Sequence, residues 1–312
     1  MKISVHTTRN SPLREITPNL DGEISTKENS LSKIFHPFET SHALRTTKDH
    51  RLLLRTSSFI DKAINEIGSI ISRKNIKTLS FDVFDTALLR SPCCEAKRFY
   101  EVASRFSAAN EGIFSAEDAF VARIDAAKAA YRFTPQAVDY TREGRIDLIA
   151  AVACAQLGVP GKQSQKVELE LEYEIEKLVP NPLVKAIIDK FPDLNLIFIS
   201  DMYLSAQQIQ RLLLPTFNDA VVFSSADGNG SKRNGGLYKH TIAKMKIDAD
   251  EILHFGDSLS SDYRGAKLAG LHGYLLPISD LERTQRLKCY IELAAKLNKK
   301  NIPLEKILPF NC

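Results

Sequence analysis

Residues 77–86 read KTLSFDVFDT, a short apolar run that ends in acidic residues. The first five residues of this run are β-rich and therefore predict a buried strand. Asp82 follows the last residue of that strand, and Asp85 lies three positions further on. An acidic turn at the end of a buried strand is a candidate site for catalysis or metal binding.

Downstream of Pro182 the sequence alternates between helical and strand patterns. Helical spacing of apolar residues covers 183–190, 205–214, 237–246 and 261–269. Strand patterns cover 194–200, 220–224, 251–255 and 273–276. Such alternation predicts an α/β fold with a doubly wound parallel sheet.

Between the first strand and Pro182 the pattern is helical almost throughout. Apolar stripes recur over 95–106, 116–131, 146–157 and 165–178. The sequence therefore predicts an α/β core over 56–91 and 183–280, interrupted by an all-helical domain over 92–182. A C-terminal helix and a polar tail are expected over 281–312.

Polar side chains lie at the ends of four predicted strands. They are Asp82, Ser200, Lys232 (in the loop after the third strand), and Asp257 with Asp262. In a parallel sheet these strand ends lie at one edge, where ligands bind. One carboxylate can act as a nucleophile, a lysine and a hydroxyl can hold phosphoryl oxygens, and a second carboxylate can bind Mg²⁺. We therefore expect phosphoryl transfer at this edge.

The order and spacing of these residues resemble the four motifs of the haloacid dehalogenase (HAD) superfamily. The resemblance covers about residues 76–278 and extends to RGAKLAG at 264–270. It implies Asp82 as the nucleophile, with Thr86, Ser200 and Lys232 as substrate-binding residues. It also implies a Mg²⁺ site built from Asp82, the backbone carbonyl of Phe84, Asp257 and Asp262, with the helical stretch 92–182 as a cap between the first and second motifs.

The sequence departs from the phosphatase pattern two places after the nucleophile. An acid is usual there, but this chain has Phe84, and the extra acid is Asp85 at the next place. Three outcomes stay open: Asp85 turns inward and acts as the catalytic acid, the cap supplies an acid, or the phosphoryl group passes to an acceptor other than water. The alternative for Asp85 is a hydrogen-bonded turn residue.

Three functions are consistent with these residues. The first is a phosphatase of a small phosphorylated metabolite, and the second is a phosphotransferase or protein kinase-like effector that uses a protein acceptor. The third is a catalytically silent HAD module used for binding. A dehalogenase ranks lower, because dehalogenases do not need the metal-binding acid that Asp257 supplies.

Residues 1–55 are rich in Ser, Thr, Asn and Pro, and we expect them to be mostly disordered. Their composition resembles the secretion leaders of bacterial type III effectors, which implies a route into a host cell without a signal peptide. Otherwise the five unpatterned cysteines and the lack of a signal peptide predict a reducing, cytoplasmic setting. A net charge of +4 spread along the chain favours no nucleic-acid partner, and no apolar run predicts a membrane span.

Overall fold

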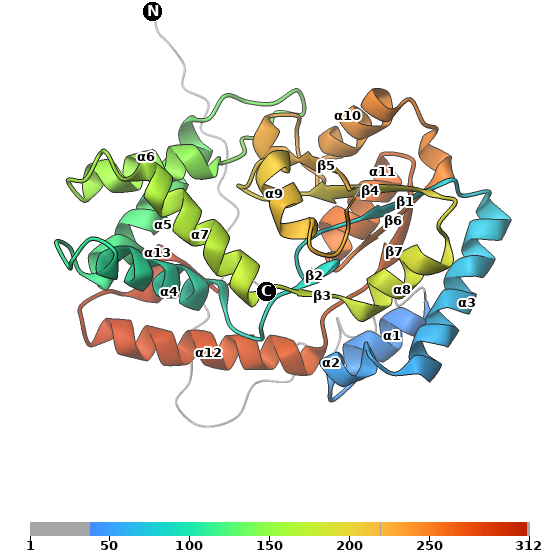
Figure 1. The fold of residues 1–312 in the computed structure, drawn as a ribbon, viewed down its shortest axis with the longest axis horizontal. Coiled ribbons are helices and arrows are strands. Elements are labelled where there is room, and N and C mark those ends of the chain that lie inside the picture. Colours follow the sequence, from blue (N-terminus) through green and yellow to red (C-terminus); the bar gives the residue numbers. More distant parts are fainter. Residues whose placement is uncertain (1–37, 219, 311–312) are drawn as a thin grey trace, which may run out of the picture. The chain divides into compact units, whose positions relative to one another are not determined.

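A five-stranded parallel sheet forms the centre of the computed structural model, which describes residues 38–218 and 220–310 (Figure 1). Its strands are β1 (Thr78–Phe81), β4 (Asn195–Ser200), β5 (Val221–Ser224), β6 (Ile252–Gly256) and β7 (His272–Leu275). They lie in the order β5-β4-β1-β6-β7, and every neighbouring pair is parallel. The predicted α/β fold with a parallel sheet is confirmed.

The two faces of the sheet bury different apolar side chains. Phe198 and Phe255 point to the face covered by α3 (Ser57–Lys74), α8 (Pro182–Lys190) and α9 (Ala206–Leu213). Ile197, Ile199 and Ile252 point to the opposite face, covered by α10 (Gly236–Met245) and α11 (Gly265–Leu268). This alternation follows from the two-residue period of a strand. Because helices cover both faces, the sheet is doubly wound.

The central strand β1 is buried on both faces, and all four of its residues are buried. The ring of Phe81 stacks on Phe255 in β6 with a centroid distance of 4.7 Å. Burial of one such ring typically contributes about 1.5–3 kcal/mol. The carboxyl end of this well-packed strand therefore holds Asp82 on a rigid support.

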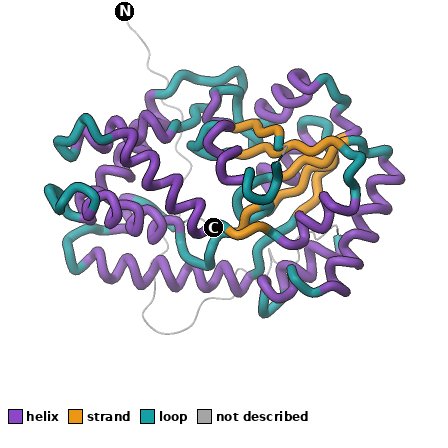
Figure 2. Tube along the Cα trace, in the orientation of Figure 1, coloured by secondary structure: helices purple, strands orange, loops and turns teal. Residues whose placement is uncertain are grey.

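Four helices lie between β1 and β4 in the sequence: α4 (Glu95–Ala108), α5 (Ala116–Phe133), α6 (Ile146–Gln156) and α7 (Gln163–Lys177). Figure 2 shows this part of the molecule as helix and loop only, separate from the strands of the central sheet. The chain leaves and re-enters the core through a short antiparallel pair, β2 (Leu88–Leu89) and β3 (Val179–Pro180). Sequence patterns located the four helices to within a few residues but missed this pair of strands.

The prediction that residues 1–55 are disordered is wrong for 38–55; residues 1–37, where most of the predicted secretion leader falls, lie outside the described residues. The chain forms α1 (Glu39–Thr46) and α2 (His50–Leu53), which bury Leu44 and Leu54.

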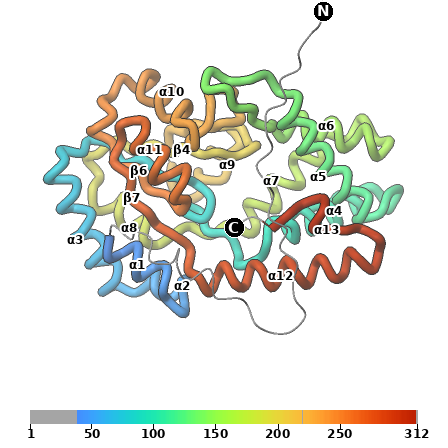
Figure 3. The backbone as a smooth tube through the Cα atoms, turned by 180° about the vertical axis from the view of Figure 1, so that it is seen from behind, coloured from blue at the N-terminus to red at the C-terminus, as the bar shows by residue number. Residues whose placement is uncertain are grey.

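The C-terminal part forms α12 (Asp280–Asn298) and α13 (Leu304–Ile307). Figure 3 shows α12 running from α1 and α2 towards α4, with α13 folding back against the helical stretch. No helix in the described part of the chain is long and apolar enough to cross a lipid bilayer.

Candidate active site

The residues predicted from the sequence meet at the carboxyl edge of the sheet. Asp82 follows β1, Ser200 ends β4 and Asp257 follows β6. Because β4, β1 and β6 are neighbours in the sheet, their ends lie side by side. A cavity of about 190 Å³ opens here, lined among others by Asp82, Ser200, Lys232, Asp257 and Asp262.

Lys232 joins two of the carboxylates in this cavity. Its ammonium group donates hydrogen bonds to Oδ1 of Asp82 and, at 2.6 Å, to Oδ1 of Asp262. All three residues are buried. Burial by itself would lower the pKa of Lys232, but the Asp262 and Asp82 carboxylates outweigh it and raise that pKa well above its ordinary value. The lysine therefore remains a cation inside the site.

Asp262 is fixed by contacts on several sides. It lies in a π-helical turn, Leu259–Arg264, and its Oδ2 accepts the backbone N–H of Ser258 at 2.9 Å. His254 lies 3.4 Å from Oδ1 and is itself 2.8 Å from the hydroxyl of Ser80 in β1. Burial would raise the pKa of Asp262, but Lys232 and His254 outweigh it and hold that pKa well below its usual range. Asp262 is thus an ionised, immobile anchor for Lys232.

Oxygen atoms of Asp82, Asp257 and Asp262 lie within 4.8 Å of one another. Burial raises the pKa of Asp82 to about 7, with Asp262 adding to the rise and Lys232 opposing it. Burial, Asp262 and Asp82 raise the pKa of Asp257 well above its ordinary value. Asp82 and Asp257 thus resist ionisation beside the ionised Asp262. Three crowded carboxylates with hard oxygen donors fit a Mg²⁺ ion, which would compensate their charge. Phe84 also lines the cavity, and the role of its carbonyl as a ligand stays a prediction.

Asp201, next to Ser200, positions the loop between β5 and α10 that carries Lys232, which we call the lysine loop. Both of its carboxylate oxygens accept the backbone N–H of Lys232, at 2.8 and 2.9 Å. The helix after β4 is capped by Ser205, whose side chain accepts the backbone N–H of Gln208. Asp201 therefore ties the end of β4 to the lysine loop. The sequence offered no signal for this contact, since 31 residues separate the two partners.

Asp85 faces an arginine, which argues against the predicted role of this residue as a replacement proton donor. Arg286 in α12 binds its two oxygens at 2.8 Å each, and the backbone N–H of Arg90 donates to Oδ1 at 3.2 Å. Burial would raise the pKa of Asp85, but Arg286 outweighs it and holds the pKa well below the usual range. A carboxyl group that stays ionised has no proton to donate. The structure thus favours the turn residue, with a left-handed backbone at φ 60°.

The two neighbours of Asp85 in the sequence, Phe84 and Thr86, are also buried. Thr86 is fully buried and does not line the cavity, while its carbonyl accepts a hydrogen bond from Asn181 at 2.8 Å. This placement argues against the predicted substrate contact of Thr86. The ring of Phe84 is buried beneath the guanidinium of Arg90, which lies 4.2 Å from the ring centroid. Sequence reasoning missed Arg90, which also lines the cavity.

The loop between α5 and α6 reaches the lysine loop from the helical stretch. Oδ2 of Asp139 accepts the backbone N–H of Ser231 at 2.8 Å. A Cβ atom on Gly230 or Gly236 would lie 2.7 or 2.5 Å from the same oxygen, so both glycines are needed for this close approach. The residue before Lys232 is therefore held from the side of the insertion.

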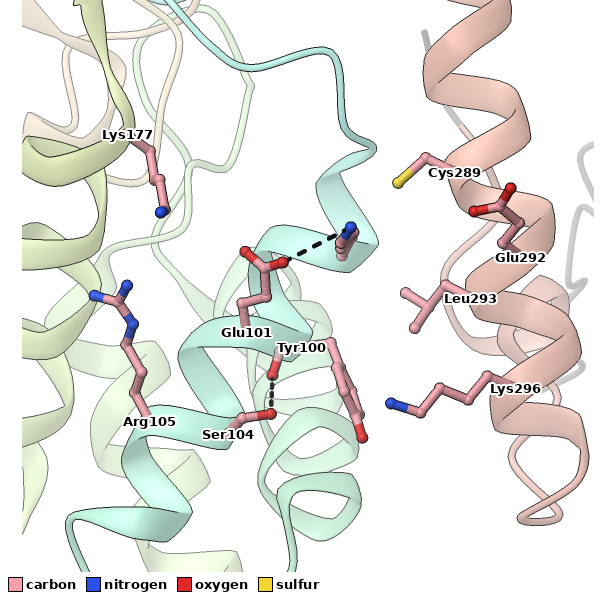
Figure 4. A pocket seen from close by; sticks show the side chains of 10 residues that line it. Tyr100, Glu101, Ser104, Arg105, Lys177, Cys289, Glu292, Leu293 and Lys296 are labelled. Atoms are coloured by element: carbon pink, nitrogen blue, oxygen red, sulfur yellow. Dashed lines mark hydrogen bonds and ion pairs between the residues drawn. The ribbon is translucent and has the colours of Figure 1, made fainter.

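A cavity of about 570 Å³ lies away from these groups, between α4, α7 and α12. Figure 4 shows Lys296 extending towards Tyr100 from the opposite side of this cavity. Lys97 lies 3.9 Å from Glu101, and the Lys296 ammonium lies 4.7 Å from the Tyr100 ring centroid. None of the residues at the carboxyl edge lines it. We therefore assign the chemistry to the smaller cavity at the strand ends.

A comparison with protein families agrees with the α/β fold described above. The family model for haloacid dehalogenase-like hydrolases matches residues 76–270, more than half of the chain. No curated protein sequence matches the chain.

Several solved structures are similar to the chain. A 2-haloacid dehalogenase from Pseudomonas syringae pv. Tomato DC3000 is 18% identical, with 70% of this chain and 100% of that chain covered and a TM-score of 0.47. A HAD family enzyme from Bacteroides thetaiotaomicron, solved with magnesium and inorganic phosphate, is 11% identical, with 64% and 93% covered and a TM-score of 0.41.

Proposed function

Because the chain belongs to the haloacid dehalogenase-like hydrolase family, we propose that it is a Mg²⁺-dependent phosphoryl-transfer enzyme that uses Asp82 as its nucleophile. The observation that carries this proposal is the position of Lys232 between Asp82 and Asp262, with Asp257 beside them at one strand edge. A buried nucleophile, a fixed cation and spare oxygen ligands are what an attack on a phosphate ester requires.

In the first step, a carboxylate oxygen of Asp82 forms a bond to phosphorus while the bond from phosphorus to the ester oxygen breaks. The leaving group departs with that electron pair and takes a proton from solvent or from the substrate's surroundings. The positively charged Lys232 attracts the negative oxygens of the transferred phosphoryl group. Ser200 offers a hydroxyl donor from the end of β4. The product of this step is an aspartyl-phosphate.

Asp82, Asp257 and Asp262 are the side chains that would hold Mg²⁺. When bound, the ion neutralises charge between the carboxylate nucleophile and the phosphate. Asp262 would contribute in two ways, because it also fixes Lys232. The insertion α4–α7 acts as the cap in this proposal, and the Asp139 loop is its contact with the lysine loop.

A small phosphorylated metabolite is the proposed substrate, with water as the final acceptor. Transfer to another acceptor, such as a protein, is the second candidate, because the turn after Asp82 lacks a free acid. Phe84 has no acidic proton to donate, and Asp85 is held ionised by Arg286. General acid–base help is typically worth about 10²–10⁴ in rate, so hydrolysis of the intermediate should be slow unless another group activates water.

Two measurements test the proposal together. The first is phosphate release from 4-nitrophenyl phosphate, with Mg²⁺ and with EDTA, for wild type, Asp82→Asn and the exposed control Asp189→Asn. The second is thermal stabilisation by beryllofluoride, which mimics a phosphoryl group bound to a carboxylate. We expect Mg²⁺-dependent release and beryllofluoride stabilisation in wild type and in Asp189→Asn, with both lost in Asp82→Asn.

Labelled ATP with protein acceptors separates the two candidates. Asp82-dependent label on protein, with little release of free phosphate, would favour transfer over hydrolysis. If wild type and Asp82→Asn behave alike in every assay, the proposed nucleophile is wrong.

A further inference from the structure

A second cavity, of about 200 Å³, adjoins the one that holds Asp82. The two cavities share three lining residues, Asp85, Arg90 and Asp257. The second cavity therefore lies directly beside the proposed nucleophile's site, with these three residues between or around the two cavities. We call this space the arginine cavity, because four guanidinium groups line it: Arg90, Arg98, Arg283 and Arg286.

Three of these arginines already have carboxylate partners. Arg286 binds Asp85 at 2.8 Å, Arg98 binds Glu174 at 2.6 Å, and Arg90 lies 3.8 Å from Glu174. These ion pairs fix the walls of the cavity. They also orient the remaining guanidinium donors, since arginine presents up to five N–H groups in a planar fork.

Arg283 is different, because its guanidinium has no hydrogen bond or ion pair to any residue in the described ranges 38–218 and 220–310. It is half-buried in α12, and its Nε is buried without a partner among them. A guanidinium in this setting offers parallel donors that match the oxygens of a carboxylate or phosphate. Its position in the wall of the arginine cavity supplies a place for such an anion.

We propose that the arginine cavity binds a second anionic group, a carboxylate or a phosphate, of the substrate that reacts at Asp82. The inference rests on the proposed function and narrows its substrate class to small phosphate esters with two anionic ends. Arg283 and Arg286 lie in α12, beyond the residues 76–270 that match the family model. This subsite is therefore supplied by the chain's own C-terminal helix.

Matched substrate pairs test the proposal. D-3-phosphoglycerate and sn-glycerol 3-phosphate differ by a carboxylate in place of a hydroxymethyl group, and glucose 1,6-bisphosphate and glucose 6-phosphate differ by one phosphate. We expect wild type to prefer the doubly anionic member of at least one pair in kcat/KM. The pair that shows the preference identifies which kind of anion the cavity takes.

Arg283→Gln should remove that preference by lowering kcat/KM for the doubly anionic substrate about 10- to 100-fold, since a charge-assisted bond is lost. The singly anionic partner should change less than about twofold on the same scale. Arg283→Lys should recover part of the loss, and Lys288→Gln, an exposed change on the same helix, should show none.

A binding measurement keeps the outcome independent of turnover. Calorimetric titration of the same four compounds into Asp82→Asn with Mg²⁺ should show tighter binding of a doubly anionic member, and Arg283→Gln in that background should abolish the difference. Equal binding within both pairs, or an equal preference with and without Arg283, overturns the arginine subsite. If 4-nitrophenyl phosphate is still hydrolysed through Asp82 in that case, the proposed function stands without it.

Discussion

The guanidinium of Arg286 binds the carboxylate of Asp85 through two hydrogen bonds of 2.8 Å, from Nη1 to Oδ2 and from Nη2 to Oδ1. The partners are 201 residues apart in the sequence. Arg286 also donates to Glu282 one turn earlier in α12, at 2.8 Å. The turn that follows the proposed nucleophile is therefore held from outside the sheet, by the C-terminal helix.

Removing one partner of this pair should destabilise the protein strongly. We expect Arg286→Ala to lower the free energy of unfolding by about 3–5 kcal/mol, because it leaves the buried Asp85 carboxylate without its main charged partner. The double variant Arg286→Ala, Asp85→Ala should lose less than the sum of the two single losses. Urea unfolding at pH 7 measures all of these values, with the exposed Lys288→Ala expected within about 0.5 kcal/mol of wild type. Additive losses would mean that the pair is not coupled.

A buried lysine in the helical insertion gives a pH-dependent prediction. Lys166 is 1% exposed, its ammonium group has no hydrogen-bond partner among the described residues, and it lies 4.9 Å from the ring centroid of Phe106. Burial lowers its pKa to about 8 from an ordinary value of 10.5. Protonation of Lys166 therefore favours the unfolded chain. The resulting loss in the free energy of unfolding is fully present below pH 8 and disappears as the pH rises towards 10.5.

Lys166→Met should accordingly raise the free energy of unfolding by about 1–3 kcal/mol at pH 7, with the gain shrinking above pH 8. Chemical unfolding of both proteins at several pH values checks this. Lys162→Met, at the N-terminal end of the same helix, is the control and should show no such pH trend. A gain that does not change with pH would point to packing rather than charge.

Metal binding should depend on Asp257 in a way that thermal unfolding detects. Without Mg²⁺, Asp257→Asn should raise the melting temperature, because it removes one of three crowded carboxylates. With Mg²⁺, wild type should gain stability, and the variant should gain less at every concentration. Asp189→Asn should follow wild type. Equal stabilisation of wild type and Asp257→Asn would remove Asp257 from the proposed metal ligands.

The contact between Asp139 and the glycines of the lysine loop should tolerate no side chain. Gly230 has a φ of 93°, and a Cβ there would lie 2.7 Å from Oδ2 of Asp139. We expect Gly230→Ala to cost about 1–3 kcal/mol in unfolding free energy. In an Asp139→Ala background the cost should shrink but persist, since the backbone strain remains. Gly161→Ala, with open space around it and an ordinary φ, should be close to neutral.

The sequence predicted the sheet well because its evidence is local. Strands β1, β4, β5 and β6 end at or just before a polar residue or Gly256-Asp257. Parallel pairing then brings Asp82, Ser200 and Asp257 together without further information. Helix α1 escaped prediction because it packs through polar residues. The hydroxyl of Thr40 donates to Glu66 at 2.7 Å and that of Ser41 to the carbonyl of Leu275 at 2.5 Å. A search for apolar stripes cannot register such contacts.

The site was predictable only where its residues follow strands. Asp85 was left between two interpretations because its partner, Arg286, lies in a helix that no motif connects to the turn. The same holds for Arg283 in the arginine cavity. Their contribution depends on how α12 crosses the molecule, and this path is set by packing against α1 and α4 rather than by any pattern near Asp82.

A domain that is joined to its core by two adjacent strands can rotate as a rigid body about that connection. Here the insertion leaves and returns through β2 and β3, but α12 packs on α4, and α13, which follows it, packs on α5. The other end of α12 is anchored at α1, where Arg45 lies 3.1 Å from Asp280. This third attachment acts as a strut across that connection. Wide opening of the insertion would have to break these contacts of α12 and α13.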